Sequence, residues 1–204
     1  KIRVILLIKD EIYKHCRVRE DLHTSLFPAI WVELSMKNTP KYQLCGCYRE
    51  WGSSETKAID EQLRRYAAFK EMVTTARKSH GDVWIGGDHN LDTGKFSKND
   101  WYLKKVRESL QEMCEQEALH IAEAGPTFQY KKEPDEVRFS TLDYFITSKK
   151  GDGEPRVSKI ISGFSDHDAI AVDLPVHREG PKKDAPMYIM KRGKIRNEKG
   201  FKYE

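Results

Sequence analysis

Two short stretches combine acidic and polar side chains with apolar runs. Residues 81–94 read GDVWIGGDHNLDTG, so Asp88 and Asn90 follow an apolar run that stops at two glycines. The stretch FSDHDAIAVDL places Asp166 and His167 in a short turn before another apolar run. Reactive side chains gather where the strands of layered α/β folds end in loops. Asp166 and His167 could supply a metal ligand and an imidazole for proton transfer.

A third stretch, STLDYFITS, carries an acid inside an otherwise apolar run. A lone carboxylate in such a strand costs several kcal/mol unless a partner satisfies it, so we expect a partner for Asp143. For Asp88 and Asn90 taken alone, an Asx-rich turn that closes a strand explains the residues equally well.

Composition predicts one soluble globular domain. The chain has 204 residues, of which 38% are hydrophobic and 33% are charged, and it shows no internal repeat or low-complexity tract. No stretch approaches the roughly 20 apolar residues of a membrane helix, so we expect no membrane and a nuclear or cytoplasmic location. Cys45 and Cys47 share one face of a strand-like segment, and we interpret them as small buried residues, with a zinc site as the alternative.

The positive charge is concentrated in residues 175–204. This segment has nine Lys or Arg against four Asp or Glu, whereas the whole chain has 36 against 32. Its prolines, glycines and lack of apolar periodicity predict a linker or tail rather than a packed element. The alternatives for this tail are a solvated tether and a non-specific phosphate-binding arm.

Residues 1–174 alternate between patterns typical of strands and of helices. Apolar residues recur every three or four positions over 59–76 and 103–113, which predicts two amphipathic helices. Short runs rich in β-branched and aromatic residues predict strands at 4–9, 29–34, 42–48, 82–87, 127–131, 140–148 and 169–176. Several of these runs are apolar on both faces, which favours layered sheets covered by helices. The fold class is therefore α/β.

The order of these motifs resembles the exonuclease-endonuclease-phosphatase superfamily. The order is Tyr48 at a strand end, then Gly-Asp-x-Asn, then an acid followed by Tyr and Phe, and then Ser-Asp-His before the last strand. Within that superfamily, IWVELSM leading to GCYREW is most similar to the endonuclease domain of LINE-type non-LTR retrotransposons. The stretch GPTF, residues 125–128, also resembles these domains. The resemblance implies a DNase-like four-layer fold, a β-sandwich flanked by helices, over residues 1–174.

The resemblance also implies a role for each motif residue that lies at or just after the end of a strand. Asp88 would orient or deprotonate the attacking water, and Asn90 would hold a phosphate oxygen. Tyr48 would donate its hydroxyl to the phosphate, and Arg49 beside it would bind substrate.

The remaining motif residues would complete a phosphodiesterase site by the same resemblance. His167 would face the scissile phosphate, and Asp143 would accept the other imidazole N–H. Asp166 would be the ligand of a Mg²⁺ or Mn²⁺ ion. The implied substrate is DNA, nicked for retrotransposition, and the implied partner is a reverse transcriptase domain on the same polyprotein.

The opening of the chain departs from the superfamily pattern. A complete domain begins with a strand ending in Asn, followed by a Glu that ligates the metal, and this sequence begins instead with KIRVILLIKDEI. We therefore expect the N-terminal part of the domain to be missing and the isolated chain to be nearly inactive. The alternatives are a catalytically inactive nucleic-acid-binding or scaffold remnant and, more weakly, a phosphatase of the same superfamily.

Overall fold

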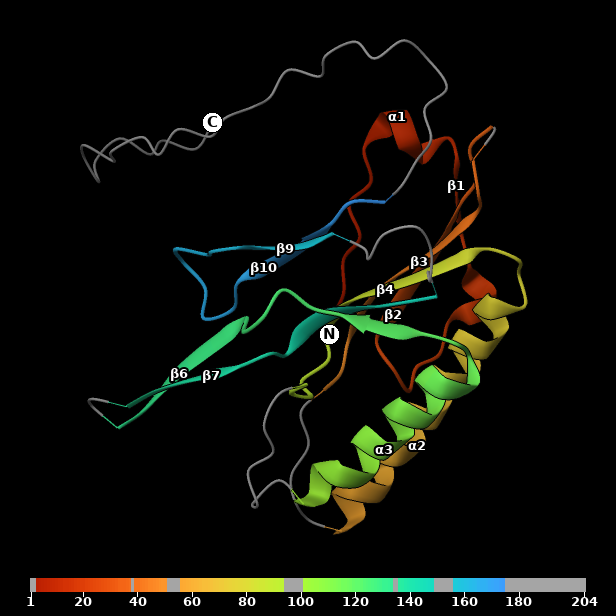
Figure 1. Ribbon diagram of the computed structural model, residues 1–204. Helices are drawn as coiled ribbons and strands as arrows, with labels where there is room; N and C mark the ends of the chain where they lie inside the picture. Colours follow the sequence, from red (N-terminus) through yellow and green to blue (C-terminus); the bar gives the residue numbers. More distant parts are fainter. Residues whose placement is uncertain are drawn as a thin grey trace, which may run out of the picture.

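A six-stranded mixed sheet forms the centre of the molecule (Figure 1). In the computed structural model, the described residues are 3–37, 39–50, 56–93, 101–133, 136–148 and 156–174. The strand order is β1-β2-β3-β4-β8-β5, where the strands are β1 (Cys16–Val18), β2 (Ala29–Leu34), β3 (Tyr42–Tyr48), β4 (Asp82–Asp88), β8 (Asp143–Thr147) and β5 (His120–Ala122). The only parallel pair among these described strands is β3 with β4, and the helix α2 (Thr56–Arg77) connects them.

Two long helices cover one face of this sheet. The helices α2 and α3 (Trp101–Gln116) lie side by side in Figure 1, as the two apolar periodicities predict. Their apolar stripes pack with the sheet into the main core, in which Phe69, Val73 and Met113 are fully buried. Cys45 and Cys47 belong to this core as free thiols, which agrees with their interpretation as small buried residues. No helix of the described residues is long and apolar enough to cross a membrane.

Two hairpins extend from the sheet on the side away from the helices (Figure 1). One pairs β6 (Phe128–Glu133) with β7 (Glu136–Ser140), and the other pairs β9 (Val157–Ile160) with β10 (Ala169–Val172). Val172 and Leu174 pack against a second, smaller apolar cluster on the sheet, formed around Tyr42 and Trp84. An isolated bridge between Phe128 and His167 links the two hairpins. This bridge sets the position of the loop that carries His167.

The strand expected at residues 4–9 is absent. These residues have no regular structure and lead into a single helical turn, α1 (Asp10–Tyr13). Ile5 and Leu7 are 72% and 90% exposed, and only Val4 and Ile8 of this apolar run are partly buried. An apolar, β-branched sequence gives a strand only where another strand can satisfy its backbone groups.

Four short strands, β1, β5, β7 and β9, were not predicted from the apolar patterns of the sequence. Each has three to five residues, and most carry charged or exposed side chains. Within the charged segment 132–137, Glu133 belongs to β6 and Glu136 to β7. The tail at 175–204 lies outside the described residues.

The two glycines before Asp88 are required by close packing around β4. A Cβ at Gly86 would lie 2.4 Å from the ring of Phe145. A Cβ at Gly87 would lie 1.9 Å from the carbonyl oxygen of Cys47, and Gly87 has φ of +152°. Side chains at these positions would therefore separate β4 from its neighbours just before the acid.

Candidate active site

Tyr48, Asp88 and Asp143 form one row across three adjacent strands. Tyr48 is opposite Asp88 in the parallel pairing of β3 with β4. Asp88 is in turn opposite Asp143 in the antiparallel pairing of β4 with β8. Residues directly opposite each other have Cβ atoms about 5 Å apart, so sheet register alone brings the two carboxylates together. The acid at the end of the buried run of β4 is therefore placed beside a second carboxylate on β8.

Asp88 and Asn90 hold each other in place where β4 ends. The backbone N–H of Asn90 donates to Asp88 Oδ1 at 2.8 Å, and its side-chain amide donates to Asp88 Oδ2 at 3.2 Å. Asn90 has φ of +45°, a left-handed conformation that Asn tolerates better than most residues. The Asx turn that we weighed as an alternative is therefore present, and it orients the Asp88 carboxylate.

His89, between these two residues, points into the core instead. It is 2% exposed and stacks on Tyr144 with ring centroids 4.2 Å apart. Cys47 Sγ lies 3.9 Å from its Nε2. Successive side chains at the end of the strand point to opposite faces, so Asp88 and Asn90 face the site whereas His89 packs in the core.

The structure corrects the role expected for Arg49. We expected it to bind substrate, but its side chain is only 5% exposed. Its Nε donates to the carbonyl of His89 at 2.6 Å, and one terminal nitrogen donates to the carbonyl of Asn90. The other terminal nitrogen donates to Gln62 of α2 at 2.8 Å. The guanidinium is therefore committed to the protein interior, because bidentate backbone contacts of this kind hold it in place.

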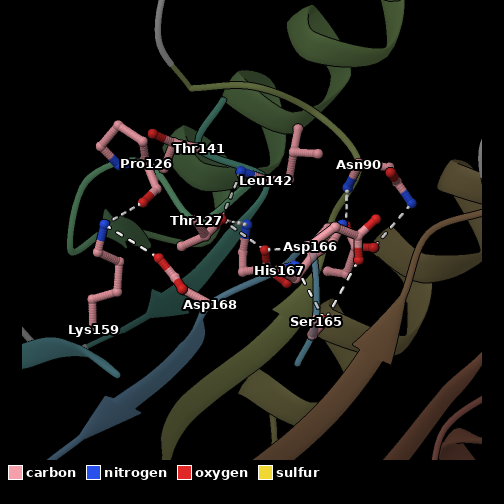
Figure 2. A network of polar contacts seen from close by, with 12 residues as sticks. Asn90, Pro126, Thr127, Thr141, Leu142, Lys159, Ser165, Asp166, His167 and Asp168 are labelled. Carbon is pink, nitrogen blue, oxygen red and sulfur yellow. Dashed lines mark hydrogen bonds and ion pairs between the residues drawn. The ribbon is translucent and has the colours of Figure 1, made fainter. Parts of the chain in front are cut away.

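Asp143 has the partner that its apolar strand required. Its Oδ2 lies 2.9 Å from His167 Nδ1, and the expected hydrogen bond between these residues is thus present. The same oxygen accepts the hydroxyl of Thr127 at 2.7 Å, and Thr127 Oγ1 accepts the backbone N–H of Asp143 at 3.1 Å. Thr127 lies between Leu142 and His167 in Figure 2. Thr127 belongs to the GPTF stretch on which the resemblance partly rests, but no sequence motif indicated this role for it.

The loop that carries His167 is fixed by hydrogen bonds from β6 and from its own flanks. The N–H of Asp168 donates to the carbonyl of Thr127 at 2.7 Å, and the N–H of His167 donates to Ser165 Oγ at 3.1 Å. Lys159 donates to the carbonyl of Pro126 at 2.7 Å and pairs with Asp168 at 3.4 Å (Figure 2). The imidazole is thereby held on the side of Asp143.

The electrostatics of the site favour a protonated imidazole and a poorly solvated carboxylate. Burial raises the pKa of Asp88 above its usual value; the charge of Asp143 adds to this effect, and the Asn90 N–H opposes it. Burial alone would lower the pKa of His167, but the hydrogen bond and charge of Asp143 outweigh it and raise the pKa. A carboxylate and an imidazole that both have raised pKa values, close together, are typical of acid–base sites.

Asp88, Asp143 and His167 could together hold a metal ion. Each offers one ligand atom, and these atoms lie within 4.8 Å of one another. The two hydrogen bonds to Asp143 both go to Oδ2, which leaves Oδ1 for a cation. Carboxylate oxygens suit Mg²⁺ or Mn²⁺, and a cation would relieve the cost of burying Asp88. The donor set therefore fits a divalent ion.

The structure does not bring Asp166, the expected metal ligand, into this group. Asp166 is exposed, and its carboxylate contacts the hydroxyl of Ser165 at 3.5 Å. Asp166 ends the bend at residues 163–166, whereas His167 forms the bridge to Phe128, so His167 contacts Asp143 while Asp166 stays exposed. Tyr48 remains beside the site, half-buried, with the guanidinium of Arg3 5.7 Å from its ring centre.

Comparison with solved structures identifies the fold. The catalytic domain of Xenopus laevis APE2 matches 78% of this chain and 59% of its own length, with TM-score 0.54 and 15% identity. The 3′ phosphatase NExo from Neisseria, solved with a product DNA hairpin, matches 70% and 63%, with TM-score 0.53 and 12% identity. Beta toxin from Staphylococcus aureus matches 71% and 56%, with TM-score 0.51 and 17% identity. No family model and no curated protein matches the sequence.

The chain has the endonuclease/exonuclease/phosphatase fold. The expected α/β class, with a central multi-stranded sheet flanked by helices, is confirmed. The chain spans about three fifths of the length of these solved structures. This is the fold that the resemblance of the sequence motifs implied.

Proposed function

We propose that this chain carries the phosphate-cleaving site of a cation-dependent phosphodiesterase that acts on DNA. The observation that carries the proposal is the convergence of Asp88, Asp143 and His167, with ligand atoms within 4.8 Å of one another. The fold adds support, because neighbours named as a 3′ phosphatase bound to a DNA hairpin and as the APE2 catalytic domain share it.

In the proposed reaction, Asp88 and His167 act on opposite sides of the phosphate. Asp88, whose pKa is raised by burial, orients and deprotonates the attacking water. Asn90 holds a phosphate oxygen, and Tyr48 donates its hydroxyl to another. A bound Mg²⁺ or Mn²⁺, held by Asp88 and Asp143 Oδ1, would neutralise charge on the phosphate oxygens.

His167 works from the opposite side with Asp143 as its support. Its Nδ1 lies against Asp143, so Nε2 is the nitrogen that would face the phosphate. When protonated, it stabilises the developing negative charge or gives its proton to the leaving oxygen. Asp143 fixes the orientation of the ring, as the carboxylate partner of a histidine does in other hydrolytic sites.

Target-DNA nicking for retrotransposition, with a reverse transcriptase domain as partner, is the finer proposal. It rests on the sequence resemblance of the Tyr48–Arg49 and GPTF stretches to LINE-type endonuclease domains. The two carboxylates that would hold the cation, Asp88 and Asp143, leave Mg²⁺ largely hydrated, so we expect slow turnover from this chain.

Single-turnover nicking of supercoiled plasmid, with protein in excess over DNA, tests the proposal. We expect slow nicking that requires Mg²⁺ or Mn²⁺ and falls at least 100-fold in His167→Ala, consistent with the loss of one acid–base group. Lys104→Met is the control, because it removes an exposed charge on α3 and leaves the loop that carries His167 unchanged. Equal background nicking by the wild type and His167→Ala, together with tight DNA binding, would favour the scaffold alternative.

A further inference from the structure

We infer that Arg49 is a positioning residue that sets the geometry of Asp88 through Asn90; this inference rests on the proposed function. Arg49 directly follows β3, and its backbone N–H donates to the carbonyl of Asp88 at 2.9 Å. Its own carbonyl accepts the side-chain amide of Asn90 at 2.8 Å. The backbone of Arg49 thus extends the β3–β4 pairing up to the active-site turn.

The guanidinium of Arg49 holds the same turn through its backbone carbonyl groups. It donates to the carbonyls of His89 and Asn90, two successive peptide groups that leave the strand. Asn90 has a left-handed backbone, a conformation that usually needs surrounding structure to hold it. A forked donor that binds both carbonyls supplies this restraint, and a lysine ammonium cannot reproduce the fork.

The restraint that Arg49 places on the turn is passed to the carboxylate of Asp88 through Asn90. Asn90 donates to both oxygens of Asp88, one bond from the backbone and one from the side chain. Its side-chain amide also donates to the Arg49 carbonyl, so Arg49 and Asp88 share one amide group. Loss of the fork would free the turn and, with it, the direction in which Asp88 presents its oxygens.

Gln62 ties this arrangement to the helical layer. Its side chain is 8% exposed, and its Oε1 accepts a guanidinium N–H of Arg49 at 2.8 Å. The turn is therefore braced against α2 as well as against β3. An arginine in this place therefore explains how the short turn at His89 and Asn90 keeps Asp88 in a fixed orientation.

A second buried arginine provides a matched control at the other end of the sheet. Arg19 is 6% exposed, forks onto Asp21 at 2.7 and 2.8 Å, and donates to Gln43 near the start of β3. Gln43 and Arg49 are separated by six residues, or about 20 Å of strand. Arg19→Lys therefore removes a comparable buried fork without touching the active-site turn.

Amide hydrogen exchange of Asn90, measured by NMR under native conditions, tests the inference. The amide of Ile146 in the fully buried part of β8 reports global opening. In Arg49→Lys we expect Asn90 to exchange at least tenfold faster after correction for Ile146. In Arg19→Lys, the two amides should change by the same factor.

Two further measurements separate positioning from stability alone. Gln62→Leu keeps both carbonyl contacts and should speed the corrected exchange of Asn90 about threefold, which covers the case in which Arg49→Lys does not fold. In single-turnover nicking, Arg49→Lys should lower the rate of the bound complex at least tenfold at unchanged DNA affinity. Absence of nicking by the wild-type protein would count against the proposed function. The role of Arg49 would be overturned if the corrected exchange rate of Asn90 in both Arg49→Lys and Gln62→Leu equalled that of the wild type.

Discussion

Removing the hydroxyl of Thr127 should destabilise the fold far more than removing its methyl group. Thr127 is 2% exposed, and its hydroxyl donates to Asp143 Oδ2 at 2.7 Å while accepting the N–H of Asp143 at 3.1 Å. A hydrogen bond to a charged group contributes about 1.5–3 kcal/mol, and a buried N–H without its acceptor costs about 1 kcal/mol more. Thr127→Val should therefore lower the free energy of unfolding by about 3 kcal/mol.

The comparison variant is Thr127→Ser, which keeps the hydroxyl and loses one methyl group at a cost of about 1 kcal/mol. Urea unfolding at pH 7, followed by circular dichroism, gives both values at equal m. Because Thr127 and His167 share Asp143 Oδ2, the imidazole should also lose its fixed orientation in the valine variant. A Thr127→Val protein as stable as Thr127→Ser would show that the hydroxyl does not hold Asp143, and the reasoning on this network would be wrong.

Two further predictions concern the glycine pair and the imidazole. Gly87→Ala should cost at least about 3 kcal/mol by urea unfolding, since its Cβ meets the Cys47 carbonyl, whereas Gly86→Ala meets a movable Phe145 ring and should cost less; equal losses would refute the difference. The His167 pKa is raised in the folded state, so its stabilising effect is complete below about pH 6.5 and disappears as pH rises through the folded value. The stability gap between wild type and His167→Gln should accordingly be larger at pH 5.5 than at pH 8.5, and parallel pH curves would contradict this.

The elements predicted best from sequence are those whose burial pattern is periodic. Residues 29–34 and 42–48 form strands with the predicted bounds, because charges or prolines flank their apolar runs. Residues 4–9 carry an equally apolar run and form no strand, since strand formation depends on a partner that a local pattern does not reveal. The short strands β1 and β5 depend on the same long-range pairing, and their three residues hold no periodicity to detect.

The site shows the same division between local and long-range information. That Asp143 needs a partner could be predicted, because a carboxylate in an apolar strand must be satisfied, and the family resemblance implied His167 as that partner. The contribution of Thr127 and the burial of Arg49 could not, since both depend on how β6 and α2 meet the strand ends. The exposure of Asp166 could not be predicted, because a motif gives the order of two neighbouring side chains but not which of them turns toward the sheet.

Paramagnetic broadening by Mn²⁺ tests the central claim most directly, namely that Asp88, Asp143 and His167 form one cation-dependent site. NMR signals of the wild-type protein would be followed during titration with Mn²⁺, with Asp88→Asn and Asp166→Asn as the paired variants. We predict that broadening begins at these three residues, that Asp88→Asn weakens it at least tenfold, and that Asp166→Asn leaves it close to wild type. Broadening centred on Asp166, or unaffected by Asp88→Asn, would contradict the assignment of the site.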